Sequence, residues 1–492
     1  HIDAAALKHT VELTSRGESA LCTLLEVALD GEAACYFVPL SLVWEDEEER
    51  LRLLQPAAVA RVRQQANVGL LADAFADPRF CHALLEHMRG ASVVEAPGGR
   101  LRFSRTPAFG DPDPDLLRTL DFHARSLSSN STAQLGDRYF LKGFRRLRKG
   151  INPELEIGRF LTTHTDYAHA VPIAGALELD LADGGEYTLA VLYRYVANQG
   201  DGWDYTLDHL ARFLEAQREA AQDPGSDAHG VYLTRVQTLG LRTGQLHLAL
   251  GTPTGDPAFD PEPVTTEDLS AWHARIVAET EASLARLRAT LGSLPSAVQA
   301  AAEPVLAREA ELIARLAAAL PPLAAGTKSR YHGDFHLAQV LLVNDDFVIS
   351  DFEGEPGRSL EERRAKHSPL RDVAGMLRSF HYAGASALLK AAAQRADDEP
   401  RLASLIDDWE RAARQAFVDA YASVAVGPER PTPEVETMTT LISLFEIEKA
   451  CYELRYELDN RPAWALIPLR GILRWVGVPP ADAAREEATW TK

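Results

Sequence analysis

The feature that most constrains this chain is a pair of short polar motifs on either side of two apolar runs. The first motif, His-Gly-Asp-Phe-His-Leu-Ala-Gln, spans 332–339, and the second, Asp-Phe-Glu-Gly, spans 351–354. Between them, residues 340–350 form two apolar runs around an Asn-Asp-Asp turn, which predicts a short β-hairpin. A hairpin places the carboxylates of Asp334 and Asp351 at the ends of neighbouring strands.

This set of side chains suits phosphoryl transfer from a nucleotide. The reaction needs a carboxylate that orients or deprotonates the acceptor hydroxyl, and it needs oxygen ligands for the Mg²⁺ on the phosphates. Two carboxylates and the amide oxygen of Gln339 supply these groups. The alternative interpretation is a solvated turn in which the carboxylates occur by chance.

Composition excludes several classes of function. The 492 residues, 46% of them hydrophobic, suffice for two or three lobes with buried cores. A net charge of −20 argues against a general nucleic-acid surface, which needs clustered Lys and Arg. The four cysteines include no Cys-x-x-Cys pair, which fits a reducing compartment. No membrane-spanning run or secretion signal is visible, so we expect a cytoplasmic protein that binds neither nucleic acid nor membrane.

Three segments are expected along the chain. Residues 1–115 contain strand-like runs and an amphipathic helix, and they end in an Asp-Pro-rich linker that we take as a boundary. Residues 116–198 have a β-rich pattern, and residues 199–492 have mostly helical periodicity around the two motifs.

Three finer expectations concern single elements. The run Ala34–Val43 reads as one strand, joined to the preceding strand at an Asp-Gly turn. The run Ala297–Leu320 reads as one long amphipathic helix. Residues 357–367 are strongly charged and are interpreted as a mobile loop.

A second group of polar residues lies in the intermediate segment. Lys142 ends an apolar strand, from which its ammonium group can reach nucleotide phosphates, and a helix begins after Asn152 with Pro at its first turn. Glu156 is the expected partner of Lys142, with Glu154 as the rival, because a strand Lys and a helix Glu form an ion pair in kinase-type sites. A surface Lys beside a helix-start Glu that the macrodipole favours would give the same pattern.

Two further stretches are candidate nucleotide contacts. The polar turn of Ser129, Asn130 and Ser131 can direct hydroxyls and backbone N–H groups at phosphates, although such turns are common. Downstream, an apolar strand runs into a glycine-containing segment that we interpret as the hinge between lobes. Backbone groups around Tyr195 and Val196 are expected to bond adenine there.

Two residues near the first motif are assigned structural roles, namely His332 and Asp372. Asp372 lies near the start of a helix, where its carboxylate can cap that helix and also accept bonds from the backbone of the catalytic loop. His247, on a long helix, is interpreted as a packed histidine rather than a catalytic one.

A late helix presents candidate acceptor contacts. Lys449, Tyr452, Glu453 and Tyr456 share one helical face by their spacing, and Arg461 follows the helix. Aromatic rings can stack on the C–H face of a sugar while the polar groups bond its hydroxyls. An interfacial face with intrahelical ion pairs would show the same spacing.

Several stretches together resemble the maltokinases, in particular the kinase part of trehalose synthase–maltokinase fusions. They are residues 152–161, 198–203, 332–339, 368–380, 448–461 and 467–469. The resemblance implies an α+β, bilobal protein-kinase-like fold with a β-rich N-terminal cap, an intermediate subdomain and a mostly helical C-lobe. It also implies ATP-dependent phosphorylation of maltose at its anomeric hydroxyl to maltose 1-phosphate, which feeds glycogen synthesis.

The same resemblance implies site roles by position. ATP and Mg²⁺ would be the cofactors, and trehalose synthase a fused or associated partner. The residues carried over are Asp334 as catalytic base, Gln339 and Asp351 as Mg²⁺ ligands, Lys142 and Glu156 on the phosphates, and Tyr452, Glu453, Tyr456 and Arg461 on the sugar, with Arg474 weaker.

Two alternatives stay open. A kinase of the same fold could act on glucosamine or an aminoglycoside, and an acidic acceptor pocket would favour it. A non-catalytic pseudokinase scaffold is the second, and it would lack a catalytic group. The chain also departs from the family because no Arg-Trp-Phe segment precedes the expected cap.

Overall fold

The computed structural model divides into two compact units. Unit 1 comprises His1–Ala197 and Pro356–Arg364, and unit 2 comprises Asn198–Glu355 and Ala365–Lys492. The structure describes residues 2–15, 18–29, 32–125, 130–219, 228–319, 326–394, 399–427, 430–432, 434–475 and 477. The division after Ala197 lies one residue from the boundary expected after position 198, whereas the return of Pro356–Arg364 to unit 1 was not expected.

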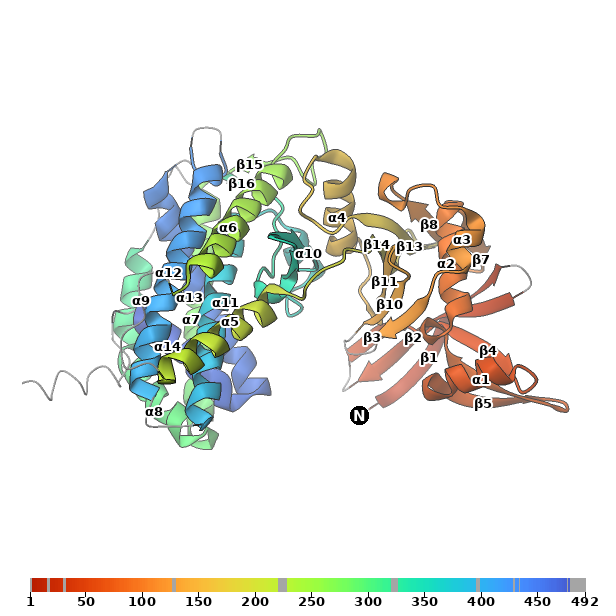
Figure 1. Ribbon diagram of the computed structural model, residues 1–492, viewed down its shortest axis with the longest axis horizontal. Helices are drawn as coiled ribbons and strands as arrows, with labels where there is room; N and C mark the ends of the chain where they lie inside the picture. Colours follow the sequence, from red (N-terminus) through yellow and green to blue (C-terminus); the bar gives the residue numbers. More distant parts are fainter. Residues whose placement is uncertain are drawn as a thin grey trace, which may run out of the picture. The chain divides into compact units, whose positions relative to one another are not determined.

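The first sheet of unit 1 has seven antiparallel strands within the described residues. Its order is β12-β3-β2-β4-β6-β5, and β1 also pairs with β2 (Figure 1). The strands are β1 (Ile2–Ser15), β2 (Glu18–Leu29), β3 (Glu32–Phe37), β4 (Leu40–Trp44), β5 (Ala58–Gln64), β6 (Asn67–Asp73) and β12 (Arg146–Leu147).

The second sheet of unit 1 also has seven described strands, all antiparallel. Its order is β7-β8-β13-β14-β11-β10-β9. The strands are β7 (Val93–Ala96), β8 (Gly99–Arg105), β9 (Phe122–Arg125), β10 (Ser131–Leu135), β11 (Tyr139–Gly143), β13 (Ile173–Leu181) and β14 (Glu186–Arg194). The buried residues of β13 and β14 include Ile173, Leu177, Val191 and Leu192, which are β-branched or long aliphatic side chains of the kind that fill central strands.

One hydrophobic core joins the two sheets. Leu24 of the first sheet and Phe103 and Leu192 of the second belong to the same buried cluster. The boundary expected at 115/116 falls within helix α3 (Pro114–Arg118), whose Leu117 is part of this cluster. The Asp-Pro-rich stretch is therefore a helix start inside unit 1 rather than a linker between compact units.

Three helices of unit 1 begin at a residue that caps them with its side chain. Asp77, Asp113 and Asn152 each accept a backbone N–H with the side chain, and Pro follows each of them. The helices are α1 (Glu48–Leu54), α2 (Pro78–Arg89), α3, α4 (Pro153–His164) and α10 (Leu360–Arg364).

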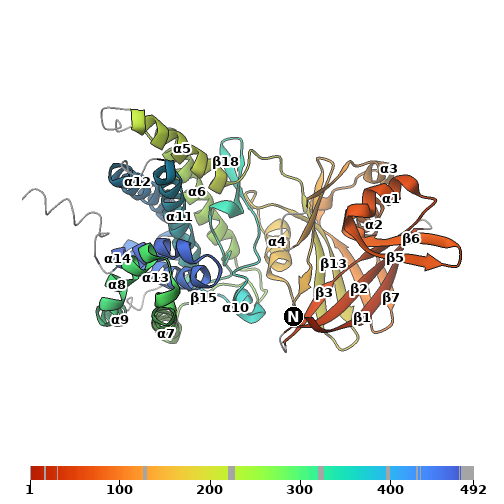
Figure 2. The same cartoon turned by 90° about the horizontal axis from the view of Figure 1, so that it is seen from below.

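Unit 2 is mainly helical. Helix α6 lies along α12, and α13 packs against both α11 and α7 (Figure 2). Its helices are α5 (Gly202–Glu219), α6 (Gly230–Leu250), α7 (Thr266–Thr290), α8 (Ser296–Ala307), α9 (Glu309–Ala318), α11 (Leu370–Gln394), α12 (Glu399–Ala425), α13 (Val435–Asn460) and α14 (Leu466–Trp475). Its short strands are β15 (Glu262–Pro263), β16 (Thr327–Lys328), β17 (Val340–Val343) and β18 (Asp346–Ile349).

Three expectations about single elements were wrong. The stretch 34–43 contains parts of two strands, because Pro39 has no N–H to donate to a ladder and separates β3 from β4. The expected helix 297–320 is two helices, since Arg308 leaves the helical region with φ −107° and ψ 15°. The charged stretch 357–367 contains α10, so it is not a loop throughout.

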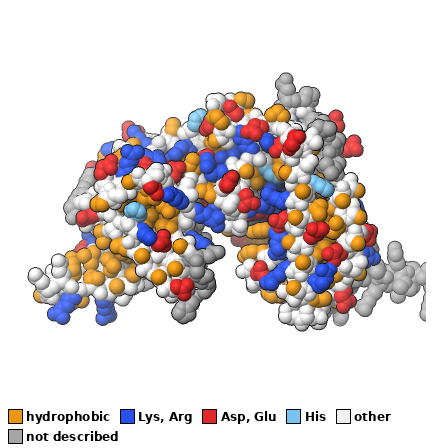
Figure 3. Space-filling model, turned by 180° about the vertical axis from the view of Figure 1, so that it is seen from behind, with side chains coloured by type: hydrophobic (Ala, Val, Ile, Leu, Met, Phe, Trp, Pro, Cys, Tyr) orange, Lys and Arg blue, Asp and Glu red, His pale blue; other side chains and the backbone are white. Residues whose placement is uncertain are grey.

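On the face in Figure 3, Lys and Arg side chains lie intermingled with Asp and Glu. No helix in the described part of the chain combines the length and the apolar character needed to cross a membrane.

Candidate active site

The predicted catalytic loop lies in unit 2 and has no regular secondary structure at 331–336. Gly333 takes a φ of 87°, and a Cβ there would lie 3.1 Å from the Cα of Gly354. This position therefore needs glycine both for its backbone conformation and for the close approach of the second motif. The side chain of Asp334, which follows, is 22% exposed.

Asp372 holds the backbone of this loop. Its carboxylate accepts the N–H of His332 at 2.7 Å and the N–H of Gly333 at 2.9 Å. Its Oδ2 also lies 3.1 Å from Nε2 of His247, whose Nδ1 is 3.0 Å from the hydroxyl of Tyr421. The bonds expected from Asp372 to the loop are present. His247 is fully buried, as expected of a packed histidine, and it orients Asp372.

The ring of His332 ties the loop to the hairpin. Its Nε2 lies 2.8 Å from the carbonyl oxygen of Ser350, and the side chain is buried between Phe335 and Phe352. A buried imidazole bonded in this way fixes the residue before the second motif. These contacts are consistent with the structural role expected of His332.

The hairpin of β17 and β18 brings Gln339 and Asp351 to its open end. Val340 lies opposite Ile349, and the N–H of Ser350 donates to the carbonyl of Gln339 at 2.9 Å. Asp351 has a left-handed backbone with a φ of 65°, which Asp tolerates better than most residues. An amide oxygen and a carboxylate are ligand types that Mg²⁺ accepts, so these two residues fit such an ion.

His336 lies beside the same groups. Its Nε2 is 3.9 Å from Oδ2 of Asp334 and 3.4 Å from Nε2 of Gln339. Burial lowers the pKa of His336, although the carboxylates of Asp334 and Asp351 act in the opposite direction. The amide nitrogen of Gln339 thus lies toward this imidazole.

Lys449 contacts the predicted catalytic carboxylate. Its Nζ lies 3.1 Å from Asp334 and 2.6 Å from the buried Glu355. Burial by itself would lower the pKa of Lys449, but the carboxylates of Glu355 and Asp334 raise it above its ordinary value. Lys449 is therefore an ammonium ion held between two carboxylates, a role that the helical spacing did not predict.

In unit 1, Lys142 pairs with Glu154 rather than with the expected Glu156. The ammonium group of Lys142 lies 2.8 Å and 3.1 Å from the two carboxylate oxygens of Glu154, which also accepts the hydroxyl of Tyr193. Glu156 instead binds Arg364 of α10 at 2.7 Å and 2.9 Å. The two glutamates point in different directions because residues two apart on a helix differ by about 200°.

The other predicted nucleotide contacts have partners inside unit 1. Ser131 accepts a bond from the Arg145 side chain at 2.7 Å, and Asn130 lies 3.5 Å from the Arg145 N–H. The N–H of Tyr195 donates to the carbonyl of Arg138 at 2.9 Å, so this N–H already has a backbone acceptor at the end of the strand. Val196 follows the strand without regular secondary structure, and Ser129 lies outside the described residues.

Two of the expected sugar contacts on and after helix α13 bind other side chains of the protein. Glu453 accepts two bonds from the buried Arg378, at 2.6 Å and 3.0 Å. Arg461 binds the buried Glu457 at 2.6 Å and 2.9 Å. Both expected sugar contacts are thus held by protein partners, so neither can be assigned to a sugar from its geometry.

The tyrosines of this helix differ in exposure. Tyr452 is half-buried beneath the ammonium group of Lys449, which lies 5.0 Å from its ring centroid. Tyr456 is 49% exposed, and Arg461 lies over its ring. Arg474, the weaker candidate, lies elsewhere in unit 2 and binds Glu410.

Sequence reasoning missed three residues that contact the site, namely Glu355, His336 and Arg378. Glu355 directly follows the second motif, and its proximity to Asp351 was a usable signal. Arg378 lies on the predicted helix after Asp372, but nothing local shows which carboxylate it meets across 75 residues of chain.

Comparisons with known proteins bear on this geometry. No protein-family model matches the chain. A glucosamine kinase of Streptacidiphilus jiangxiensis is 27% identical over 291 residues, which are 59% of this chain and 58% of that protein. A glucosamine kinase of Mycolicibacterium smegmatis is 24% identical over 348 residues, 69% of this chain and 75% of that protein. The chain thus spans little more than half the length of the first relative.

Solved structures extend the likeness to nearly the whole chain. A glucosamine kinase in complex with glucosamine, ADP and inorganic phosphate has a TM-score of 0.62 at 20% identity, covering 96% of this chain and 94% of that one. Crystal form B of a glucosamine kinase gives 0.64, covering 97% and 94%. The chain shares their fold.

These findings revise the expectations in part. They confirm a mixed fold of sheets and helices. They do not support maltokinases specifically, because the relatives named above are glucosamine kinases. The kinase-like bilobal arrangement stays a prediction.

Proposed function

We propose that this protein transfers the terminal phosphoryl group of ATP to a hydroxyl of an amino sugar, with glucosamine as the acceptor. The observation that carries the proposal is the clamped loop of Asp334, whose backbone Asp372 holds from both His332 and Gly333. Phosphoryl transfer depends on positioning, and a single carboxylate held in this way meets that need. The glucosamine kinases among the relatives support the acceptor.

In the proposed reaction, Asp334 accepts the proton of the acceptor hydroxyl while that oxygen bonds to the γ-phosphorus of ATP. The bond from this phosphorus to the bridging oxygen breaks, and ADP leaves. Gln339 and Asp351 would hold a Mg²⁺ ion, and that ion would neutralise charge on the phosphates when bound. Lys142, oriented by Glu154, is proposed to contact the phosphates.

The charges around Asp334 favour an amino sugar. Asp334 and Glu355 together carry two negative charges, and Lys449 supplies one positive charge. The excess negative charge suits an acceptor that carries an ammonium group. An aminoglycoside shares this chemistry, and it belongs in the same assay.

Maltose is a second candidate acceptor. The rings of Tyr456 and Trp464 both lie against the guanidinium of Arg461, and aromatic rings of this kind can bind neutral sugars. Transfer would then occur at the anomeric hydroxyl, and a trehalose synthase partner would supply the maltose.

An ADP-release assay with several acceptors tests the proposal. We expect turnover with glucosamine and at least tenfold lower kcat/KM with N-acetylglucosamine, which lacks the ammonium group. Turnover with maltose but not with glucosamine would show that maltose is the acceptor. Turnover with an aminoglycoside alone would show that an aminoglycoside is the acceptor. ADP binding without transfer to any acceptor would support the pseudokinase alternative.

The role of Asp334 has a matched control in the hairpin turn. Asp334→Asn should lower kcat by about 10²–10⁴ and leave ADP binding intact, because it removes the proton acceptor while Lys449 keeps its pair with Glu355. Asp345→Asn should leave kcat unchanged, since Asp345 is 91% exposed and binds Arg235 at the surface. Full activity in Asp334→Asn would contradict the assignment.

A further inference from the structure

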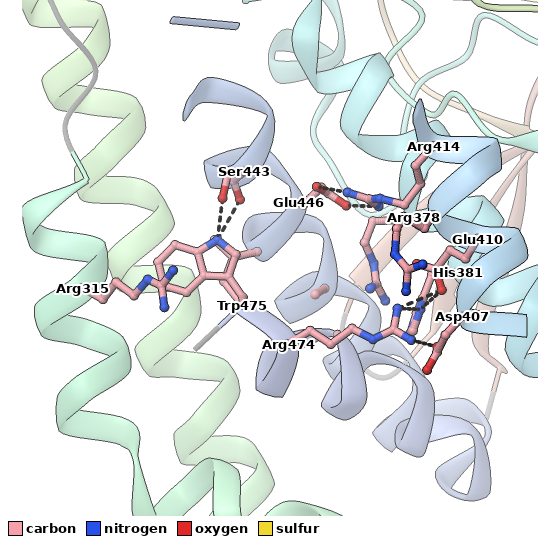
Figure 4. Close-up of a pocket in the computed structure, with 14 residues that line it drawn as sticks. Arg315, Arg378, His381, Asp407, Glu410, Arg414, Ser443, Glu446, Arg474 and Trp475 are labelled. Atoms are coloured by element: carbon pink, nitrogen blue, oxygen red, sulfur yellow. Dashed lines mark hydrogen bonds and ion pairs between the residues drawn. The ribbon is translucent and has the colours of Figure 1, made fainter. Parts of the chain in front are cut away.

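A cavity of about 520 Å³ lies within unit 2, among helices α9, α11, α12, α13 and α14 (Figure 4). Its volume is within the roughly 300–1,000 Å³ of small-molecule sites. From α13 it is lined by Glu446, Ile447 and Ala450. These residues lie on a different side of the helix from Lys449 and Tyr452, so the cavity is separate from the candidate active site.

The charged lining of this cavity has an excess of arginine. It includes five arginines and three carboxylates, although the chain as a whole carries a net charge of −20. The residues are Arg315, Arg378, Arg411, Arg414, Arg474, Asp407, Glu410 and Glu446. Guanidinium groups gathered in a concave site concentrate anions from solution.

Two of the arginines account for the three carboxylates. Arg414 binds Glu446 through both oxygens, at 2.7 Å and 2.8 Å. Arg474 binds Glu410 at 2.8 Å and also binds Asp407 (Figure 4). Five guanidinium groups and three carboxylates leave the lining a net charge of +2, and Arg378 and Arg411 also pair with carboxylates just outside the lining.

The remaining arginines frame the cavity. Arg411 binds only the exposed Asp408 among the pairs of the described residues, and the side chains of that pair are 75% and 63% exposed. Arg315 lies over the ring of Trp475, 5.0 Å from its centroid. The indole N–H of Trp475 donates to the Ser443 hydroxyl at 2.8 Å, which fixes the ring.

We propose that this cavity binds a sugar phosphate. The phosphate takes the guanidinium charge that the lining carboxylates leave over, because arginine forms strong charge-assisted bonds to phosphate. The carboxylates of Glu410 and Glu446 accept sugar hydroxyls, and Trp475 supplies an apolar surface. The site goes beyond the proposed function, since none of the proposed catalytic residues lines it.

Arg378 connects this site to the acceptor helix. Its guanidinium lines the cavity and donates to Glu453 at 2.6 Å and 3.0 Å. Gly471 makes room for it, because a Cβ there would collide with the guanidinium. A phosphate in the cavity competes with Glu453 for Arg378, and the ligand therefore changes acceptor binding, a consequence that rests on the proposed function.

Calorimetry on the full chain tests the site, with saturating ADP and glucosamine present to occupy the active site. We expect glucose 6-phosphate to bind, and glucose and inorganic phosphate to bind at least tenfold more weakly. The double variant Arg315→Gln/Arg411→Gln should weaken glucose 6-phosphate binding at least tenfold, and both side chains are exposed, so the fold should persist. Arg308→Gln, an exposed arginine outside the lining, should stay within twofold.

If the double variant bound glucose 6-phosphate as tightly as the wild type, the site would be overturned. The same holds if saturating ADP and glucosamine abolished the binding of glucose 6-phosphate. Inorganic phosphate binding as tightly as glucose 6-phosphate would overturn the sugar part of the proposal. These binding measurements need no turnover, so their outcome does not depend on the proposed function.

A kinetic measurement tests the connection through Arg378. Glucose 6-phosphate should change the acceptor KM at least threefold in the wild type and not in Gly471→Ala. An unchanged wild-type KM would overturn that connection.

Discussion

Lys449 Nζ lies 3.1 Å from Oδ1 of Asp334, a contact between residues 115 positions apart. The same ammonium group lies 2.6 Å from Glu355, so a single side chain of α13 joins the catalytic loop to the end of the second motif. The relationship couples the acceptor helix to the predicted base. A change at Lys449 should therefore affect both stability and turnover.

Lys449→Met should destabilise the protein by about 2–3 kcal/mol. The change removes the Lys449 cation from the buried Glu355, and the loss is below the about 3–5 kcal/mol of a fully buried pair because Lys449 is one-fifth exposed. Urea unfolding measures the difference. The double variant Lys449→Met/Glu355→Gln should recover part of the loss, and equal stabilities of the single variant and the wild type would contradict the pairing.

Asp372→Ala should lower both stability and kcat. It leaves the buried N–H groups of His332 and Gly333 without an acceptor, at about 1–3 kcal/mol each, and it releases the loop that positions Asp334. We expect a loss of about 2–4 kcal/mol and a fall in kcat of about 100-fold.

His247→Phe is a milder change to compare with Asp372→Ala. It removes one bond to Asp372 and leaves both loop bonds in place, so kcat should fall by less than in Asp372→Ala. Asp419→Ala, on the exposed face of α12, should change neither quantity. A larger kcat loss in His247→Phe than in Asp372→Ala would show that the loop is not held through Asp372.

Glu154→Gln should weaken ATP binding at least tenfold, whereas Glu156→Gln should stay within threefold. Glu154 orients Lys142, while Glu156 binds Arg364 at the other side of the helix start. Titration with a non-hydrolysable ATP analogue measures both variants. If Glu156→Gln weakened ATP binding more than Glu154→Gln did, Glu156 would be the functional partner of Lys142.

Stability should fall as the pH is lowered from 6.5 to 4, in part through His209. Burial, with the nearby charges of His229 and Arg212, lowers the pKa of His209 to about 4. The unfolded chain then binds a proton that the folded chain does not, so the stabilisation is complete above pH 6.5 and is lost as the pH falls through this window.

Urea unfolding at pH 7 and pH 4.5 tests this titration. His209→Gln should reduce the pH-dependent loss by about 1–2 kcal/mol, a value that allows for the partial exposure of the ring. His273→Gln is the control, because the pKa of His209 does not depend on it. An identical pH dependence in His209→Gln and the wild type would exclude His209 as the source.

Local patterns predicted the parts of the site that depend on neighbouring residues. The hairpin of residues 340–349 forms because two apolar runs flank a turn in which Asn344 takes a φ of 56°. The helix that carries Asp372 and the helix that carries Lys449 follow from three-four spacing. Pro39 and Arg308 mark where longer runs were wrongly taken as single elements.

By itself, the sequence determined the chemistry present: the carboxylates, amide and lysines suited to phosphoryl transfer, and the helices and strands that carry them. Only the tertiary structure decided which of these groups meet. Periodicity assigns Glu154 and Glu156 to different sides of one helix, but the packing of that helix against the sheet that contains β11 selects Glu154 for Lys142. In the same way, the packing of α11, α13 and the catalytic loop directs Lys449 to Asp334 and Arg378 to Glu453. These contacts join residues far apart in the chain, and their geometry arises from the packing of whole elements rather than from any local pattern.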